Sequence, residues 1–277
     1  MRLLLLTLVA LLTAVSFAAA EPGGGEWVHE VSGGGVVLIG YTGAGGKVEV
    51  PRSIGGVPVV AVGDGWGPVF GGRNNSVEEV VVPPGVQRIS AYAFHGCEAL
   101  ARVSLPEGLS VIGNSAFAAC PKLSAIEIPQ GVSVVGDHAF SGCPRLAKVS
   151  FPAGLRVVGA YAFADCVRLA EAVLPEGTEV VGERAFSGCR GLKNVVLPNT
   201  LVSAGNWAFS GTPALENLSL PARFTAQIGV MGFTGELASR LMAQGVAGIL
   251  DSLAERNQPA PGETAAPAPV EGELPAD

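Results

Sequence analysis

Five cysteines are the residues of this chain best suited to covalent or metal chemistry, and they recur at one interval of 23 residues. They are Cys97, Cys120, Cys143, Cys166 and Cys189. Metal sites built from thiolates usually hold two of them a few residues apart, so this spacing does not suit a metal ion. The sixth copy of the position holds Thr212. We therefore favour a small buried side chain, and disulfides between neighbouring copies remain the alternative.

Residues for acid–base or phosphate chemistry do not form a recognisable site. The three histidines, His29, His95 and His138, are not spaced from a serine or cysteine as a nucleophile and its base would be. The glycine clusters at 33–35 and 43–46 lack the strand-to-helix context of a phosphate-binding loop. No pair of carboxylates on the expected strands suits glycoside hydrolysis. We expect a protein that is not an enzyme, without catalytic residues, cofactor or metal ligands.

Two groups of side chains are candidates for ligand binding. The first is a row of cations that follows successive cysteines: Lys122, Arg145, Arg168 and Arg190. Stacked coils would hold them ~5 Å apart, either as a solvated rim balanced by nearby acids or as a strip for an acidic polysaccharide or protein surface. The second is Trp66 with Arg73, since Trp and Arg are common at binding hot spots. Alternatively, Trp66 packs over the end of the core, and Trp207 is expected to be structural.

Other residue types repeat with the same period of 23. These repeats indicate the structural elements that would position the candidate residues. Leucine, proline and phenylalanine repeat with this period, the phenylalanines being Phe94, Phe117, Phe140, Phe163, Phe186 and Phe209. Such a period indicates a solenoid, in which each coil buries its apolar face against its neighbours. We expect the phenylalanines and cysteines to stack in columns along the core, with backbone hydrogen bonds between successive coils.

The remaining segments differ from the repeats in composition. Residues 1–20 have a basic start, an apolar run and small residues before position 21, which is typical of a cleaved signal peptide, with a membrane anchor as the alternative. No later segment is apolar enough to span a membrane. The organisation that we expect is a signal peptide at 1–20, a leader and N-terminal β cap at 21–50, a solenoid at 51–221 with an irregular first coil at 51–83, a C-terminal helical cap at 222–256, and a disordered acidic tail rich in proline and alanine at 257–277.

Residues 100–120, LARVSLPEGLSVIGNSAFAAC, resemble the repeat of the BspA-like, or Treponema-type, leucine-rich repeat family. The stretch GYTGAGGKVEVPRSIGGVPVVAVGD resembles its N-terminal cap and first coil. The resemblance covers about residues 40–221 and departs from the pattern at Thr178, at Ala204 and in the longer coil of Phe70. It implies a mostly-β, α/β-type solenoid that is right-handed and curved, with a parallel sheet on one face. Family members are exported bacterial proteins, and some are surface adhesins.

These observations together predict a non-catalytic recognition module that is exported to the periplasm, the cell surface or the medium. We expect its partner to be a protein or glycan at the cell surface. A net charge of −7 argues against nucleic acid as a general partner. The alternatives are a structural or self-associating envelope protein and a protein that binds anionic glycans. The oligomeric state is not predicted.

Overall fold

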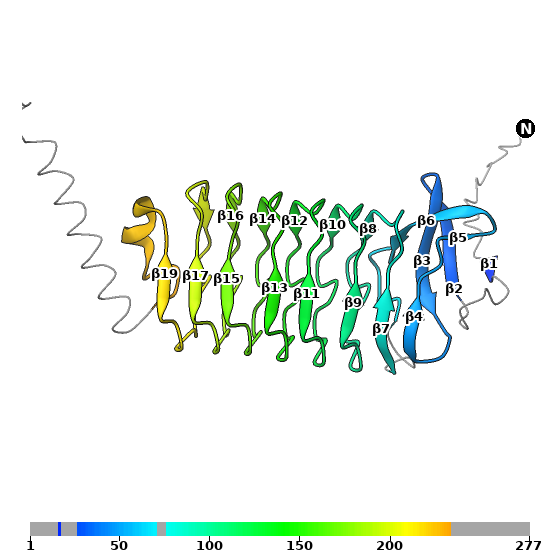
Figure 1. Cartoon of the computed structure of the whole chain (residues 1–277), viewed down its shortest axis with the longest axis horizontal. Coiled ribbons are helices and arrows are strands. Elements are labelled where there is room, and N and C mark those ends of the chain that lie inside the picture. Colours follow the sequence, from blue (N-terminus) through cyan, green and yellow to red (C-terminus); the bar gives the residue numbers. More distant parts are fainter. Residues whose placement is uncertain (1–15, 18–26, 71–75, 234–277) are drawn as a thin grey trace, which may run out of the picture.

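The structure, a computed structural model, describes residues 16–17, 27–70 and 76–233. Figure 1 shows β coils that lie side by side in one long row. About eight turns of roughly 23 residues form a right-handed type of solenoid with little helix. The predicted mostly-β solenoid is thereby confirmed.

Short strands of successive coils pair in parallel along one side of the row. Each strand pairs with the strand 23 residues further on, as Val111 does with Val134. Because the offset equals the repeat, equivalent residues of neighbouring coils lie side by side. The strands are β8 (Arg88–Ile89), β10 (Val111–Ile112), β12 (Val134–Val135), β14 (Val157–Val158), β16 (Val180–Val181) and β18 (Ser203–Ala204).

A second set of strands lies on the other side of the coils and divides into three parallel sheets. The ladder of this second set is interrupted between β9 and β11 and between β13 and β15, whereas the strands from β8 to β18 form one continuous parallel sheet on the first side. In several of these strands the central residue is buried and its neighbours point outward. The sheets are β4 (Gly46–Glu49), β7 (Val77–Val81) and β9 (Arg102–Ser104); β11 (Ala125–Glu127) and β13 (Lys148–Ser150); and β15 (Glu171–Val173), β17 (Asn194–Val196) and β19 (Asn217–Ser219).

An antiparallel hairpin stands at the N-terminal end of the row. Its strands are β2 (Trp27–Ser32) and β3 (Gly35–Tyr41), and β3 continues in parallel with β6 (Val57–Val62) of the first coil. Two short strands join this end antiparallel to their neighbours: β1 (Ser16–Phe17) pairs with β2, and β5 (Ser53–Ile54) pairs with β6. At the other end the description closes after a 3-10 helix, η2 (Ala222–Gln227). The predicted helix within 234–256 and the tail at 257–277 lie outside the described residues, as do 1–15 and 18–26.

Stacked phenylalanine rings form the centre of the core. From Phe94 to Phe209 successive ring centroids are 4.8–5.3 Å apart and the ring planes differ by 3–8°. Phe70 stacks on Phe94 at 4.9 Å, so the longer first coil still places its ring in the column. Phe233 continues the column beyond Phe209. One apolar spine therefore runs through the coils instead of separate small cores.

The cysteines form a second column beside the rings, and all five are buried and free. From Cys120 onward each thiol donates to the carbonyl oxygen of a phenylalanine 26 residues earlier, over 3.1–3.3 Å. Burial raises the pKa of the Cys166 and Cys189 thiols well above the ordinary value. A protonated, buried thiol is a poor nucleophile. These contacts leave the cysteines a packing role.

Candidate recognition surfaces

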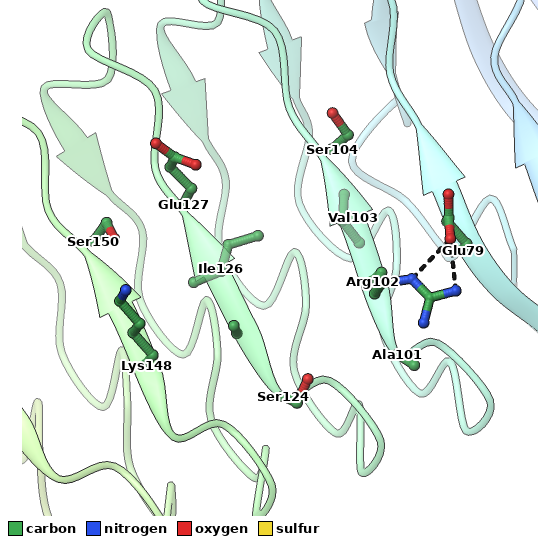
Figure 2. A pocket seen from close by; sticks show the side chains of 11 residues that line it. Glu79, Ala101, Arg102, Val103, Ser104, Ser124, Ile126, Glu127, Lys148 and Ser150 are labelled. Atoms are coloured by element: carbon green, nitrogen blue, oxygen red, sulfur yellow. Dashed lines mark hydrogen bonds and ion pairs between the residues drawn. The ribbon is translucent and has the colours of Figure 1, made fainter.

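The outer face of the strands carries a depression of about 450 Å³. Figure 2 shows that it spans β7, β9, β11 and β13, and therefore the interruption between β9 and β11. Arg102 reaches from β9 to Glu79 on β7, with nitrogen–oxygen distances of 2.8 Å from Nε and 2.7 Å from Nη2. Glu127 and Lys148 lie on the next two strands. Because the Glu79 carboxylate is paired with a cation and separated from Glu127 by β9, this mixture of charges suits polar contacts, not acid–base catalysis.

The four predicted cations are all exposed, in the turns that follow the cysteines. Lys122 and Arg145 line one open depression of about 720 Å³, together with Glu98. Arg168 and Arg190 lie in the next two turns and are not among the residues that line it. Within residues 27–70 and 76–233, none of the four forms an ion pair. The nearby acids therefore do not balance this rim through direct contacts.

Trp66 is 91% exposed. The interpretation that it packs over the end of the core is therefore wrong. Its backbone N–H donates to the Asp64 carboxylate at 2.9 Å, which holds the loop in a local turn. Arg73, proposed as its neighbour in a binding loop, lies outside the described residues.

A third surface, which was not predicted from the sequence, lies two residues before the phenylalanines from Phe94 to Phe209. In the six coils from Phe94 to Phe209 this residue is not glycine and adopts the left-handed conformation, with φ between 51° and 62°. Among the described residues only two other non-glycine residues, Ala119 and Asp165, have positive φ. We call this set the left-handed row; it consists of Tyr92, Ser115, His138, Tyr161, Arg184 and Trp207.

Four side chains of the left-handed row stack on one another along the solenoid: His138, Tyr161, Arg184 and Trp207. The rings of His138 and Tyr161 lie 4.7 Å apart at 8°. The guanidinium carbon of Arg184 is 5.6 Å from the Tyr161 ring centroid and 4.8 Å from that of Trp207, within the range of cation–π attraction. Arg184 also donates to the Tyr161 hydroxyl at 2.6 Å. Trp207 nevertheless stays 46% exposed, so this end of the stack faces solvent. The structural role expected for Trp207 stays a prediction.

The described residues contain no arrangement that suits a metal or a membrane span. No group of three or more His, Cys, Asp or Glu side chains in this part of the chain could hold an ion. None of its helices has the length and apolarity needed to cross a bilayer. His29 is buried, and its Nδ1 has no hydrogen-bond partner among the described residues.

Comparisons with known proteins agree with this architecture. The profile of the BspA type leucine-rich repeat region matches residues 69–178 and 156–241 in six copies. The crystal structure of a leucine-rich repeat protein of Treponema pallidum is 33% identical, with a TM-score of 0.66 over 76% of this chain and 96% of that one. A leucine-rich repeat protein from Bacteroides ovatus is 27% identical, with a TM-score of 0.55 over 70% of this chain and 57% of that one. No curated protein matches the sequence. The chain belongs to the BspA-type leucine-rich repeat family.

Proposed function

We propose that the chain is an exported, adhesin-like recognition module without catalytic activity, and that it binds a protein partner through the left-handed row. The observation that carries this proposal is the use of tyrosine, histidine, arginine and tryptophan where glycine would fit the backbone better. A second left-handed position, just before each cysteine or Thr212, is glycine in four of six coils: Gly96, Gly142, Gly188 and Gly211.

Left-handed backbone costs a residue with a Cβ about 1–2 kcal/mol relative to glycine. A row of such residues at an exposed position is consistent with a functional constraint, since local strain of this kind concentrates at binding and catalytic sites. Tyr, Trp and Arg are also the residue types most enriched at protein–protein hot spots. The stacking of Tyr161, Arg184 and Trp207 fixes their side chains before binding, which reduces the entropy that a complex must lose.

Export and capping belong to the same proposal. The signal-peptide pattern of residues 1–20 supports export. Trp27 of the hairpin β2–β3 packs against Phe70, which supports an N-terminal cap. The apolar periodicity of 234–256 supports a helical cap at the other end. The family's repeat architecture supports a binding module, because a rigid row of coils presents variable side chains over a long surface.

The test compares capture by residues 21–277 with capture by a variant that carries Tyr161→Gly, Arg184→Gly and Trp207→Gly. Glycine removes the side chains while keeping the left-handed backbone. The control is Val134→Thr with Val202→Thr, two exposed residues outside the row. Proteins from an extracellular-matrix extract should bind to the immobilised wild type and the control and be lost from the glycine variant. Equal capture by all three proteins, or recovery only of the chain itself, would refute the proposed function.

A further inference from the structure

The basic strip, defined as Lys122, Arg145, Arg168 and Arg190, is a row of cations in successive coils that forms no ion pair within the described residues. Arg102 pairs with Glu79 at 2.7 Å, Lys193 pairs with Glu216 at 3.2 Å, and Arg156 pairs with Glu179. These pairs all join residues 23 positions apart in neighbouring coils. Some cations are thus neutralised between coils, whereas single cations such as Lys148 and the four members of the strip form no ion pair among the described residues.

The strip has a regular spacing that the solenoid imposes. Over the same coils the phenylalanine centroids advance by 5.2–5.3 Å per coil. Lys122, Arg145 and Arg168 occupy the same place in three successive coils, and Arg190 is displaced by one residue in the fourth. Like charges held at this spacing repel one another, and a bound row of anions would relieve that repulsion.

The surroundings of the strip leave room for a chain-like ligand. Gly96, Gly142, Pro121 and Pro144 line the depression beside Lys122 and Arg145, and none of them projects a long side chain into it. Glu98 is the one acid that lines this depression, and it belongs to the coil before Lys122. The cations therefore continue away from Glu98, along the direction in which the coils stack.

We propose that the basic strip binds an acidic polysaccharide that carries one carboxylate on each sugar ring. A pyranose ring is about as long as one coil is thick, so successive carboxylates can meet successive cations through their long, adjustable side chains. An extended acidic peptide fits less well, because its side chains on one face are about 6.6–6.8 Å apart. This site goes beyond the proposed function, since it lies on a different surface and takes a different ligand.

The test measures the affinity of residues 21–277 for polygalacturonate, at low and at physiological salt, by isothermal titration calorimetry. The variant with Arg145→Glu and Arg168→Glu should bind polygalacturonate at least about tenfold more weakly. The two substitutions change the charge of the strip by four units, and each exposed ion pair with the ligand contributes modestly to binding. Arg145→Gln with Arg168→Gln should give an intermediate loss. The control, Arg52→Glu with Arg88→Glu, makes the same charge change at exposed positions outside the strip and should bind as the wild type does.

Two further ligands and one further variant separate the possible outcomes. Neutral dextran should not bind, and poly-L-glutamate should bind more weakly than polygalacturonate of equal charge. Equal affinity for poly-L-glutamate would overturn the assignment to a polysaccharide, and equal weakening by the control variant would overturn the assignment to the strip. The glycine variant of the left-handed row should bind polygalacturonate as the wild type does. The proposal for the left-handed row and the proposal for the basic strip can therefore fail independently of each other.

Discussion

Gly182→Ala tests how closely the coils stack, because Gly182 lies where two coils have no room for a side chain. A Cβ there would be 2.4 Å from the backbone nitrogen of Ala160 and 2.6 Å from the carbonyl carbon of Gly159. Equivalent glycines in the other coils meet the preceding coil in the same way: Gly113, Gly136, Gly159 and Gly205. The backbone of Gly182 is not in the left-handed region, so alanine is excluded by the neighbouring coil and not by its own conformation.

The expected cost follows from these distances. Non-bonded carbon atoms prefer separations of about 3.5–4.0 Å, so the two coils must move apart locally by about 1 Å. Overpacking of this kind costs about 1–3 kcal/mol. The Gly182 N–H donates to the Val158 carbonyl at 2.8 Å. Moving the coils apart breaks this hydrogen bond, which adds about 1 kcal/mol to the cost. We expect the free energy of unfolding to fall by about 2–4 kcal/mol and Tm by on the order of 10 °C.

Urea unfolding of residues 21–277, followed by circular dichroism, measures this change. The matched control is Gly108→Ala, where a Cβ would meet nothing within 4 Å. Alanine at that exposed turn should leave stability unchanged or raise it by about 0.4–1 kcal/mol, since it restricts the unfolded chain. If Gly182→Ala destabilises the protein no more than Gly108→Ala does, the coils are not packed at the distances described and the argument fails.

Two other outcomes follow from the core. The Phe163 ring is fully buried between two other phenylalanine rings, at centroid distances of 5.2 and 5.3 Å. Phe163→Ala should therefore lower the free energy of unfolding, measured in urea, by about 3–5 kcal/mol. A loss below about 1 kcal/mol would contradict the continuous column. The five thiols should resist an aromatic disulfide reagent at pH 8 in the folded protein and react fully in denaturant, whereas rapid reaction of the folded protein would contradict their burial. The pKa of the Cys166 and Cys189 thiols is raised in the folded protein, so folding favours their protonated form. This contribution to the free energy of unfolding is complete below the unfolded thiol pKa of about 8.5 and is lost as the pH rises above it. Urea titrations at rising pH should show the decline.

Much of the solenoid could be predicted from the sequence because its period is carried by residues whose size and polarity matter in the core. The phenylalanine column follows from spacing alone, and Phe70 enters it although its coil is longer than the others. The glycine after each short strand also follows from the period, since only a residue without a Cβ lets the coils approach. A parallel ladder tolerates no slip between such columns.

The recognition surfaces were harder to predict for physical reasons. Tyrosine, arginine and tryptophan disfavour left-handed backbone, so no propensity argument places them there. Comparison of equivalent positions in each coil does find the row, because Tyr161, Arg184 and Trp207 stand 23 residues apart. The exposure of Trp66 depends on the path of a glycine-rich loop, which residue types do not determine. The division into three sheets is equally invisible in a sequence whose period does not change.

Every surface described above depends on equivalent residues of successive coils lying in columns, and one distance measurement tests this directly. Glu107 and Asn199 occupy the same exposed position four coils apart and are separated by 92 residues in the sequence. Spin labels on cysteines introduced at these two sites, with the native thiols buried, should give one narrow distance distribution in pulsed electron–electron resonance. The stacked coils predict a distance near 20 Å, four times a strand spacing of about 4.8 Å. A broad distribution, or a distance twice as long, would contradict the account.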